Sequence, residues 1–310
     1  MFRFMHVITI ALMLTFAVTA AFAAGEAEPA ASEGGETATQ GERGALQVFV
    51  SILPQKDWVE RIAGETADVS VMVPPSGQPH NYEPTPQQVT SLSEADVYFR
   101  IRVPFEVQFM ERIERSLEGL RVVDVTENVE RRRFDPSVRS ADGEAKAPID
   151  PHVWLGPEQV LAMAATIRDA LIELRPEHAE LYRENHAAFA AQIEELRDDL
   201  ADDLSPLRGE TMFVFHPAFG YFADSFGLEQ KAVEIGGNEP SPRELERIIE
   251  EAQAEGVRVI FVQPQFAKDA AEQVAQAIDG AVIPINPLAE DWLSNMRTIA
   301  ERLRDGMHAD

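Results

Sequence analysis

One uninterrupted stretch constrains the fold of this chain more than any other. From Glu177 to Leu204 there is no glycine or proline, and apolar residues recur at spacings of three, four and seven, as on one face of a helix. These apolar positions are Tyr182, Phe189, Ile193, Leu196, Leu200 and Leu204. At about 1.5 Å per residue, such a helix extends roughly 40 Å, which is longer than a single lobe of a chain this size. We therefore expect a spine helix over residues 176–205 that bridges two lobes.

On both sides of this spine, short apolar runs alternate with longer amphipathic segments. The expected strands are 46–52, 67–73, 96–101 and 121–125 before the spine, and 211–215, 231–234, 257–263 and 281–285 after it. Such alternation predicts parallel sheets covered by helices on both faces. The expected fold class is α/β: two lobes, each with a mainly parallel sheet flanked by helices, joined by one long spine helix. The N-terminal lobe is expected at 46–175 and the C-terminal lobe at 206–310.

The first residues have the features of a cleaved export signal. Arg3 precedes an apolar run from Val7 to Ala21, and Ala21-Phe22-Ala23 has the small-x-small pattern of a signal peptidase site. This run is shorter than the ~20 apolar residues that span a bilayer. We expect a signal peptide at 1–23, followed by a flexible linker at 24–45 that has almost no large apolar residue.

Net charge and cysteine content indicate the cellular compartment and restrict the classes of possible binding partner. The formal net charge is −26 at pH 7, so nucleic acid would be repelled, whereas cationic ligands and solubility are favoured. The chain has no cysteine, which excludes a disulfide framework and a lipid-modified cysteine after the signal. These features predict a soluble periplasmic protein. The polar stretch from Glu127 to Ala147, including Arg131-Arg132-Arg133, is expected to be a solvated loop.

Three histidines stand beside proline, which holds each of them in a stiff loop. They are His80 after Pro79, His152 after Pro151, and His216 before Pro217. His80 and His216 follow expected strands, one in each lobe, and open α/β sheets bind ligands beyond the carboxyl ends of their strands. Three imidazoles and a fourth group form a tetrahedral site for zinc or another late first-row divalent ion. Spacing alone leaves open three unrelated surface or capping histidines.

Two further histidines lie at the spine. His186 falls on the apolar stripe between Tyr182 and Phe189, and His178 is near the exposed start of the helix. Packing and exposure account for both, so we do not expect either to be a ligand. A helix is expected directly after His216, over residues 217–226.

Four proline-containing motifs follow one another along the chain. They are Pro75-Ser76-Gly77-Gln78-Pro79-His80-Asn81-Tyr82-Glu83-Pro84-Thr85-Pro86, Asp150-Pro151-His152-Val153-Trp154-Leu155, Phe215-His216-Pro217-Ala218-Phe219-Gly220-Tyr221-Phe222 and Pro284-Ile285-Asn286-Pro287-Leu288. In this order they resemble the motifs of the zinc/manganese solute-binding proteins of ABC importers, the TroA-like family that includes the zinc uptake binding proteins. The resemblance runs from about Leu46 to the C-terminus.

This resemblance implies two α/β lobes joined by one long helix, with a divalent metal ion between them. It implies that His80, His152 and His216 are the metal ligands, and that the ion is delivered to the membrane permease of an ABC importer. It further implies a binding protein rather than an enzyme, and we expect a monomer. Asp150 is expected to be a partner of His152 or a turn former rather than a ligand.

The fourth ligand departs from the family pattern. Members commonly carry aspartate where this chain has Asn286, and a neutral amide oxygen is a weaker zinc ligand than a carboxylate. Asn286, a water molecule and another acid such as Glu234 are the candidates. Three imidazoles without an assured carboxylate favour Zn²⁺ over Mn²⁺, which prefers oxygen ligands, although Mn²⁺ stays an alternative. Zinc binding is then expected to weaken as pH falls through about 6.5.

Two other functions fit the same histidines. A secreted zinc-dependent hydrolase also has three histidines and an open fourth position, and Glu83 or Glu234 could then act as a base, although no spacing marks either. A binder of a metal chelate would need a large cleft lined by aromatic residues. Under the hypothesis that the chain binds a free metal ion, the rigid spine helix limits hinge closure, so only modest movement of the lobes is expected on binding.

Overall fold

The computed structural model describes residues 44–117, 119–134, 147–234, 241–266 and 269–307. The expected signal peptide at 1–23 and the expected linker up to residue 43 lie outside these ranges. Within the described residues, no helix combines the length and the apolar character needed to cross a membrane.

The first sheet contains four parallel strands in the order β2-β1-β3-β4. The strands are β1 (Leu46–Val50), β2 (Ala67–Val71), β3 (Val97–Arg100) and β4 (Arg121–Asp124). The helices of this half are α1 (Leu53–Ala63), α2 (Pro86–Leu92), α3 (Pro104–Ser116) and α4 (Pro157–Leu174). All four strands predicted from the sequence are present, and each is somewhat shorter than its apolar run.

The second sheet repeats that strand order as β6-β5-β7-β8, and its strands are again all parallel. The strands are β5 (Thr211–Val214), β6 (Glu229–Ala232), β7 (Val259–Val262) and β8 (Ala281–Pro284), and the helices are α6 (Gly220–Phe226), α7 (Pro242–Ala254), α8 (Asp269–Ala277) and α9 (Trp292–Met307). The predicted α/β fold class is confirmed. Helix α6 begins three residues later than predicted, because the chain after His216 first forms a turn in which the Ala218 amide donates to the His216 carbonyl at 2.8 Å.

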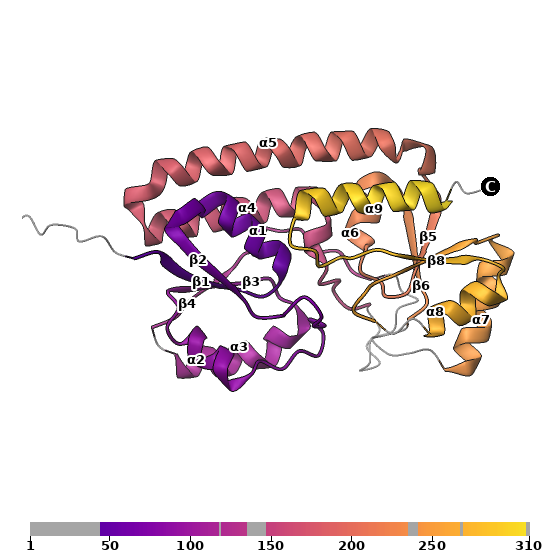
Figure 1. Cartoon of the computed structure of the whole chain (residues 1–310), viewed down its shortest axis with the longest axis horizontal. Helices are drawn as coiled ribbons and strands as arrows, with labels where there is room; N and C mark the ends of the chain where they lie inside the picture. Colours follow the sequence, from indigo (N-terminus) through magenta and orange to yellow (C-terminus); the bar gives the residue numbers. More distant parts are fainter. Residues whose placement is uncertain (1–43, 118, 135–146, 235–240, 267–268, 308–310) are drawn as a thin grey trace, which may run out of the picture. The chain divides into compact units, whose positions relative to one another are not determined.

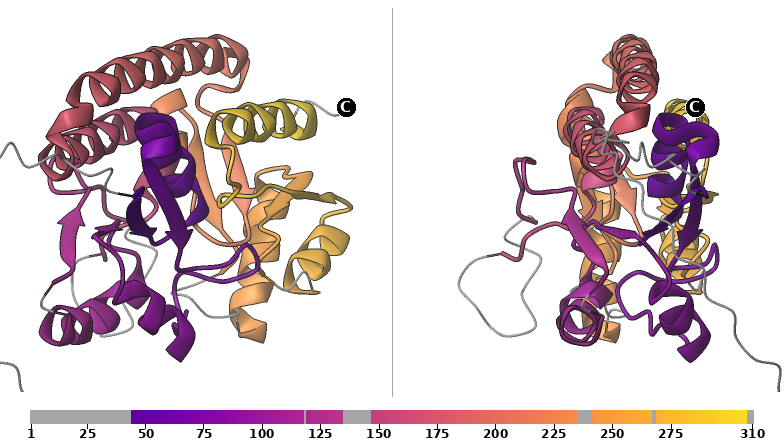
Figure 2. Two further views of the ribbon diagram at one scale, coloured as in Figure 1. Left: turned by 60° about the vertical axis from the view of Figure 1, so that its left-hand side comes forward. Right: turned by 90° about the vertical axis from the view of Figure 1, so that its left-hand side faces the viewer.

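The predicted spine is α5, which spans Ala179–Asp203 and has 25 residues. A short 3₁₀ turn over Pro176–His178 precedes it, as is common at the ends of α-helices. Helix α5 is about 37 Å long at 1.5 Å per residue. Helix α5 contacts α1 and α4 of the first half and α9 of the second (Figure 1). The two further views show the same arrangement of α5 along α4 (Figure 2).

Three buried tryptophans connect the two halves. Trp292, at the start of α9, donates from Nε1 to the carbonyl oxygen of Trp154 at 2.6 Å. Trp154 in turn donates from Nε1 to the carbonyl oxygen of Pro287 at 2.8 Å. The ring of Trp58 on α1 packs edge-on against Trp292, with centroids 6.3 Å apart. A single hydrophobic cluster therefore contains side chains from both sheets and from α5, which couples the halves by packing as well as by chain connection.

Candidate metal centre

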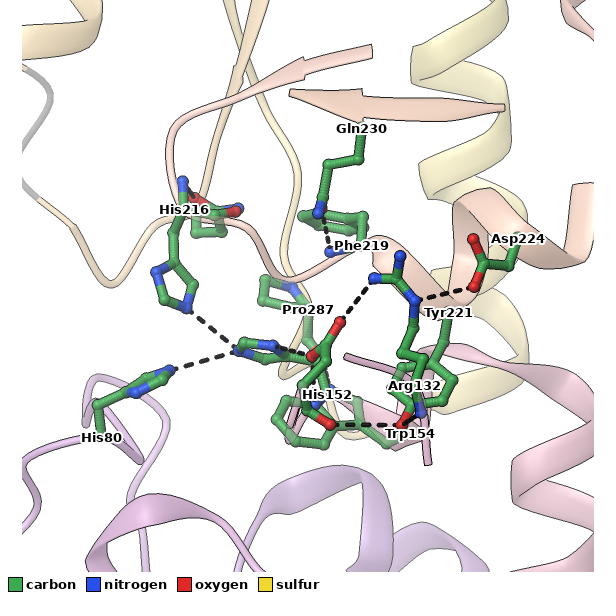
Figure 3. A network of polar contacts seen from close by, with 12 residues as sticks. His80, Arg132, His152, Trp154, His216, Phe219, Tyr221, Asp224, Gln230 and Pro287 are labelled. Carbon is green, nitrogen blue, oxygen red and sulfur yellow. Dashed lines mark hydrogen bonds and ion pairs between the residues drawn. The ribbon is translucent and has the colours of Figure 1, made fainter. Parts of the chain in front are cut away.

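The three histidines predicted from the sequence converge on one point (Figure 3). His80 lies in the loop between β2 and α2, His152 directly precedes the 3₁₀ turn Val153–Leu155, and His216 follows β5. Nε2 of His152 is 3.4 Å from Nε2 of His80 and 3.1 Å from Nε2 of His216. Candidate donor atoms of all three rings lie within 4.8 Å of one another. The two sheets thus contribute neighbouring imidazoles, as expected for loops at the carboxyl ends of parallel strands.

Buried carboxylates orient two of these rings. Nδ1 of His152 is 2.8 Å from Oδ1 of Asp150, and Nδ1 of His216 is 2.7 Å from Oε2 of Glu234. An ionised carboxylate only accepts hydrogen bonds, so each Nδ1 carries the proton and donates it. The Nε2 atom of each ring is then left with a free lone pair. This is the arrangement by which carboxylates fix metal-binding histidines in other proteins.

The distances between Nε2 atoms match a tetrahedral metal site. With zinc–nitrogen bonds of about 2.0–2.1 Å, two ligands of a tetrahedral ion are about 3.3 Å apart. The two observed Nε2 separations, 3.1 and 3.4 Å, lie on either side of that value. Lone pairs that face each other at this distance repel unless a cation lies between them. The arrangement of the three rings therefore suits a bound cation.

Burial keeps the imidazoles in the form that binds metal. The pKa of His80 is well below its ordinary value, because of burial and then because of the neighbouring His216 and His152 rings. Burial also lowers the pKa of His152, although Asp150 opposes this effect. For Asp150 itself, burial opposes ionisation, but hydrogen bonds from His152 and Arg132 outweigh burial and leave the pKa lowered. At neutral pH the site therefore combines neutral His80 and His152 rings with an ionised Asp150.

Arg132 fixes Asp150 from the other side. Its Nη1 lies 2.8 Å from Oδ2 of Asp150, and its Nε lies 2.8 Å from Oδ2 of Asp224 on α6 (Figure 3). Gly220 makes room for this guanidinium, because a Cβ at that position would lie 1.4 Å from Arg132 Nη1. The prediction that Arg131-Arg132-Arg133 is a solvated face is therefore wrong for Arg132.

The cavity beside the three histidines is small, with a volume of about 20 Å³. It is lined by Gln78, Pro79, His80, Val103, Pro104, Pro151, His152, Trp154, His216, Ala218, Gln265, Phe266, Pro287 and Leu288. None of these described lining residues is an aspartate or a glutamate. A volume of this order holds one ion or one water molecule.

Neither protein group expected as the fourth ligand lines this cavity. Oδ1 of Asn286 accepts hydrogen bonds from Gln265 Nε2 at 2.9 Å and from the Leu288 amide at 3.0 Å. Glu234 binds the outer nitrogen of His216, on the far side of the ring from the other histidines. Glu83 is exposed and also lies outside the lining.

His178 and His186 are not part of the cluster formed by described residues. The ring of His178 packs near Tyr182, with centroids 6.0 Å apart, and Nδ1 of His186 is 3.2 Å from Arg168 Nη1. Both positions agree with the prediction that these histidines have packing or surface roles.

Sequence reasoning missed the loop after β7. Phe266 stacks on the His216 ring at 4.7 Å between centroids, and the Gln265 carbonyl accepts a hydrogen bond from Gln78 Nε2 at 2.6 Å. The loop that carries His80 is thereby tied to the loop that covers His216. The sequence does contain a signal for the role of this loop in the site. Pro264-Gln265-Phe266 directly follows a predicted strand, where ligand-binding loops of α/β sheets are found.

Comparisons with known proteins agree on one family. The family model of the zinc-uptake complex component A, periplasmic (ZnuA), matches residues 48–306. A protein of Chlamydia muridarum (strain MoPn / Nigg), provisionally named a metal-binding protein, is 30% identical over 275 residues, covering 88% of this chain and 94% of its own. The manganese-binding lipoprotein MntA of Halalkalibacterium halodurans is 28% identical over 237 residues, covering 75% of this chain and 76% of its own. A crystal structure of ZnuA superposes with a TM-score of 0.79 and 35% identity, covering 84% of this chain and 99% of that one.

Proposed function

This chain belongs to the family of the periplasmic zinc-uptake complex component A and is a metal-binding solute-binding protein of that family, and from this premise we propose that its cargo is Zn²⁺. We further propose that His80, His152 and His216 are the ligands. The protein is exported by the signal at 1–23, captures the ion in the periplasm and delivers it to the membrane permease of an ABC importer.

The observation that carries this proposal is the geometry of the three Nε2 atoms. His152 Nε2 lies 3.1 Å from that of His216 and 3.4 Å from that of His80, and two of the rings are held by carboxylates at Nδ1. A packing role would not require the Nε2 atoms of three imidazoles to converge, nor two of these rings to be held by buried carboxylates. A tetrahedral ion explains all of these features together.

The donor set favours zinc over manganese. The described lining of the cavity contains imidazoles and amides but no carboxylate, and manganese prefers oxygen-rich sites of higher coordination number. The charge of the ion is balanced from outside its coordination shell by Asp150 and Glu234, which act through His152 and His216. Both carboxylates are buried, so solvent screens this attraction weakly.

The same observations argue against the two alternative functions. A hydrolase needs a base near the metal-bound water, whereas no described lining residue is a carboxylate and Glu234 is engaged by His216. A metal chelate needs far more room than about 20 Å³. A bare ion fits a cavity of that size.

Capture and release require only small movements in this fold. His80 and His216 come from opposite halves, so a bound ion links the loops of both. The tryptophans at the junction and α5 limit how far the halves can separate. We therefore place the movement that admits the ion in the loops around His80 and Phe266 rather than in a wide hinge.

Zinc titration against a chelator of known affinity tests this proposal, together with metal analysis and competition between Zn²⁺ and Mn²⁺. The variants His80→Ala, His152→Ala and His216→Ala should each lose most of their zinc affinity. His178→Ala and His186→Ala are matched controls that also remove an imidazole, and they should bind as the natural chain does. Unchanged affinity in all three site variants would overturn the proposal, and preferential retention of Mn²⁺ would overturn the choice of zinc.

A further inference from the structure

The fourth protein ligand can be deduced from the side chains that surround the cavity, an inference that rests on the proposed function. Three imidazoles leave one position of a tetrahedral ion to fill. Among the described lining residues, the side chains with an oxygen are Gln78 and Gln265. Gln78 uses its amide nitrogen on the Gln265 carbonyl at 2.6 Å.

The amide of Gln265 is oriented by a chain of hydrogen bonds. The Leu288 backbone amide donates to Oδ1 of Asn286 at 3.0 Å, so this Asn286 atom must be the acceptor oxygen. The same oxygen accepts from Gln265 at 2.9 Å, so the Gln265 atom there must be the donor Nε2. The orientation of the Gln265 amide is thus fixed, and Oε1 is its other atom.

Oε1 of Gln265 is buried and has no hydrogen-bond partner among the described residues. Buried carbonyl oxygens almost always have a partner, so one without a partner beside a cation site needs an explanation. The backbone carbonyl of Gln265 accepts a hydrogen bond from Gln78, and the next residue, Phe266, stacks on the His216 ring. Gln265 is therefore a well-anchored residue that lines the same cavity as His80, His152 and His216 and has one unused acceptor.

We propose that Oε1 of Gln265 is the fourth ligand of the bound ion, and that Asn286 positions it rather than binding the metal. Asn286 takes the place of a carboxylate in the sequence pattern, but its oxygen already accepts two hydrogen bonds. The resulting set of three imidazoles and one amide oxygen is neutral. A neutral set dominated by nitrogen favours zinc and Co²⁺ over Mn²⁺.

Substitutions at Gln265 and at Asn286 test the roles of these two residues separately. Gln265→Ala removes the proposed ligand, and Gln265→Leu removes it while keeping much of its volume. Asn286→Leu removes the acceptor that orients Gln265, so it should act only through Gln265 and add nothing in a Gln265→Leu background. Gln159→Ala is a matched control, because Oε1 of Gln159 is also buried without a partner among the described residues but does not line the cavity.

The experiment loads the full-length mature protein with Co²⁺, whose visible absorption reports its ligands, and measures Zn²⁺ affinity in parallel. Gln265→Ala and Gln265→Leu should change the Co²⁺ spectrum and lower zinc affinity by about tenfold or more. Gln159→Ala should leave the Co²⁺ spectrum as it is in the natural chain, and the double variant Gln265→Leu/Asn286→Leu should have the spectrum of Gln265→Leu alone. Melting temperatures confirm that each variant is folded.

Two results would overturn the assignment of Gln265. An unchanged spectrum in both Gln265 variants would mean that water or another group fills the fourth position. A spectrum of the double variant that differs from that of Gln265→Leu would mean that residue 286 itself touches the ion. In either case the natural chain would still bind zinc through its histidines, whereas failure of the natural chain to bind either ion would overturn the proposed function as well.

Discussion

Asp150 and His152 form two hydrogen bonds with each other although only one residue separates them. Oδ1 of Asp150 accepts from the His152 backbone amide at 2.9 Å and from its Nδ1 at 2.8 Å. The first contact closes a local turn and the second fixes the ring. One carboxylate oxygen therefore sets both the backbone and the side chain of a proposed metal ligand, while its other oxygen pairs with Arg132.

The substitution Asp150→Ala tests this coupling. It removes the acceptor that holds the proton on Nδ1 of His152, so Nε2 no longer has a fixed lone pair. Zinc affinity should fall by about 10–100-fold, the usual effect of losing a partner of a metal-binding histidine. Chelator competition measures this loss. Asp198→Ala, which removes an exposed carboxylate on α5, is the control, and a loss no larger than in that control would contradict the role of Asp150.

Gly220→Ala perturbs the same network without replacing a titratable residue. The new Cβ would lie 1.4 Å from Arg132 Nη1 and 2.8 Å from Asp150 Oδ2, so the guanidinium must move away from Asp150. We expect a decrease in zinc affinity that is smaller than for Asp150→Ala, and a loss of about 1–3 kcal/mol of stability from overpacking. Zinc titration and denaturant unfolding measure the two effects. Gly119→Ala is the control, because its Cβ would meet nothing within 4 Å; equal behaviour of the two variants would count against the Arg132–Asp150 pair.

The fold and the histidines were accessible from the sequence because the signals that encode them are local. Hydrophobic periodicity predicts α5 and the parallel strands, and proline beside His80, His152 and His216 marks stiff loops at strand ends. Asp150 could be related to His152 for the same reason. Each of these features depends on residues close together in the chain.

Arg132 and Gln265 could not be assigned in this way, because their roles depend on contacts between distant segments. Arg132 lies in a polar stretch that the sequence predicts to be solvent-exposed. It contacts Asp150 only because α6 packs against this stretch and Gly220 leaves room for its guanidinium. Gln265 gains its orientation from Asn286, which follows another strand. The shared strand order of the two sheets was also hidden, since no sequence repeat accompanies it.

Two buried tryptophans provide a matched pair for testing what couples the halves of the molecule. Trp292 donates a hydrogen bond to the Trp154 carbonyl, whereas Nε1 of Trp58 has no partner among the described residues. Both side chains are fully buried and pack against each other. Trp292→Phe leaves a buried carbonyl without its donor and should cost about 1–3 kcal/mol more than Trp58→Phe. Equilibrium unfolding in denaturant measures both, and equal losses would show that ring packing alone joins the halves.

Zinc affinity should fall less steeply with pH than it would for three histidines of ordinary pKa. Three independent imidazoles with the ordinary pKa of about 6.5 would each be half protonated at that pH, so zinc affinity would be about eightfold lower than at high pH. In this protein burial lowers the pKa of His80 and of His152, so both stay neutral as pH falls through 6.5. We therefore expect zinc affinity at pH 6.5 to be within about threefold of its value at pH 7.5, with the main loss at lower pH.

The same shifts determine how the metal-free protein responds to acid. Unfolded histidines take up protons below about pH 6.5, whereas the folded His80 and His152 do not, so the unfolded state binds more protons there. The stabilising contribution of the neutral pair is present above pH 6.5 and is lost as pH falls from that value towards the folded pKa values. Unfolding of the metal-free chain between pH 7.5 and 5.5 measures this slope, and the double variant His80→Ala/His152→Ala should have a shallower one. An eightfold loss of zinc affinity by pH 6.5, or a slope that the double variant leaves unchanged, would contradict the depressed pKa values.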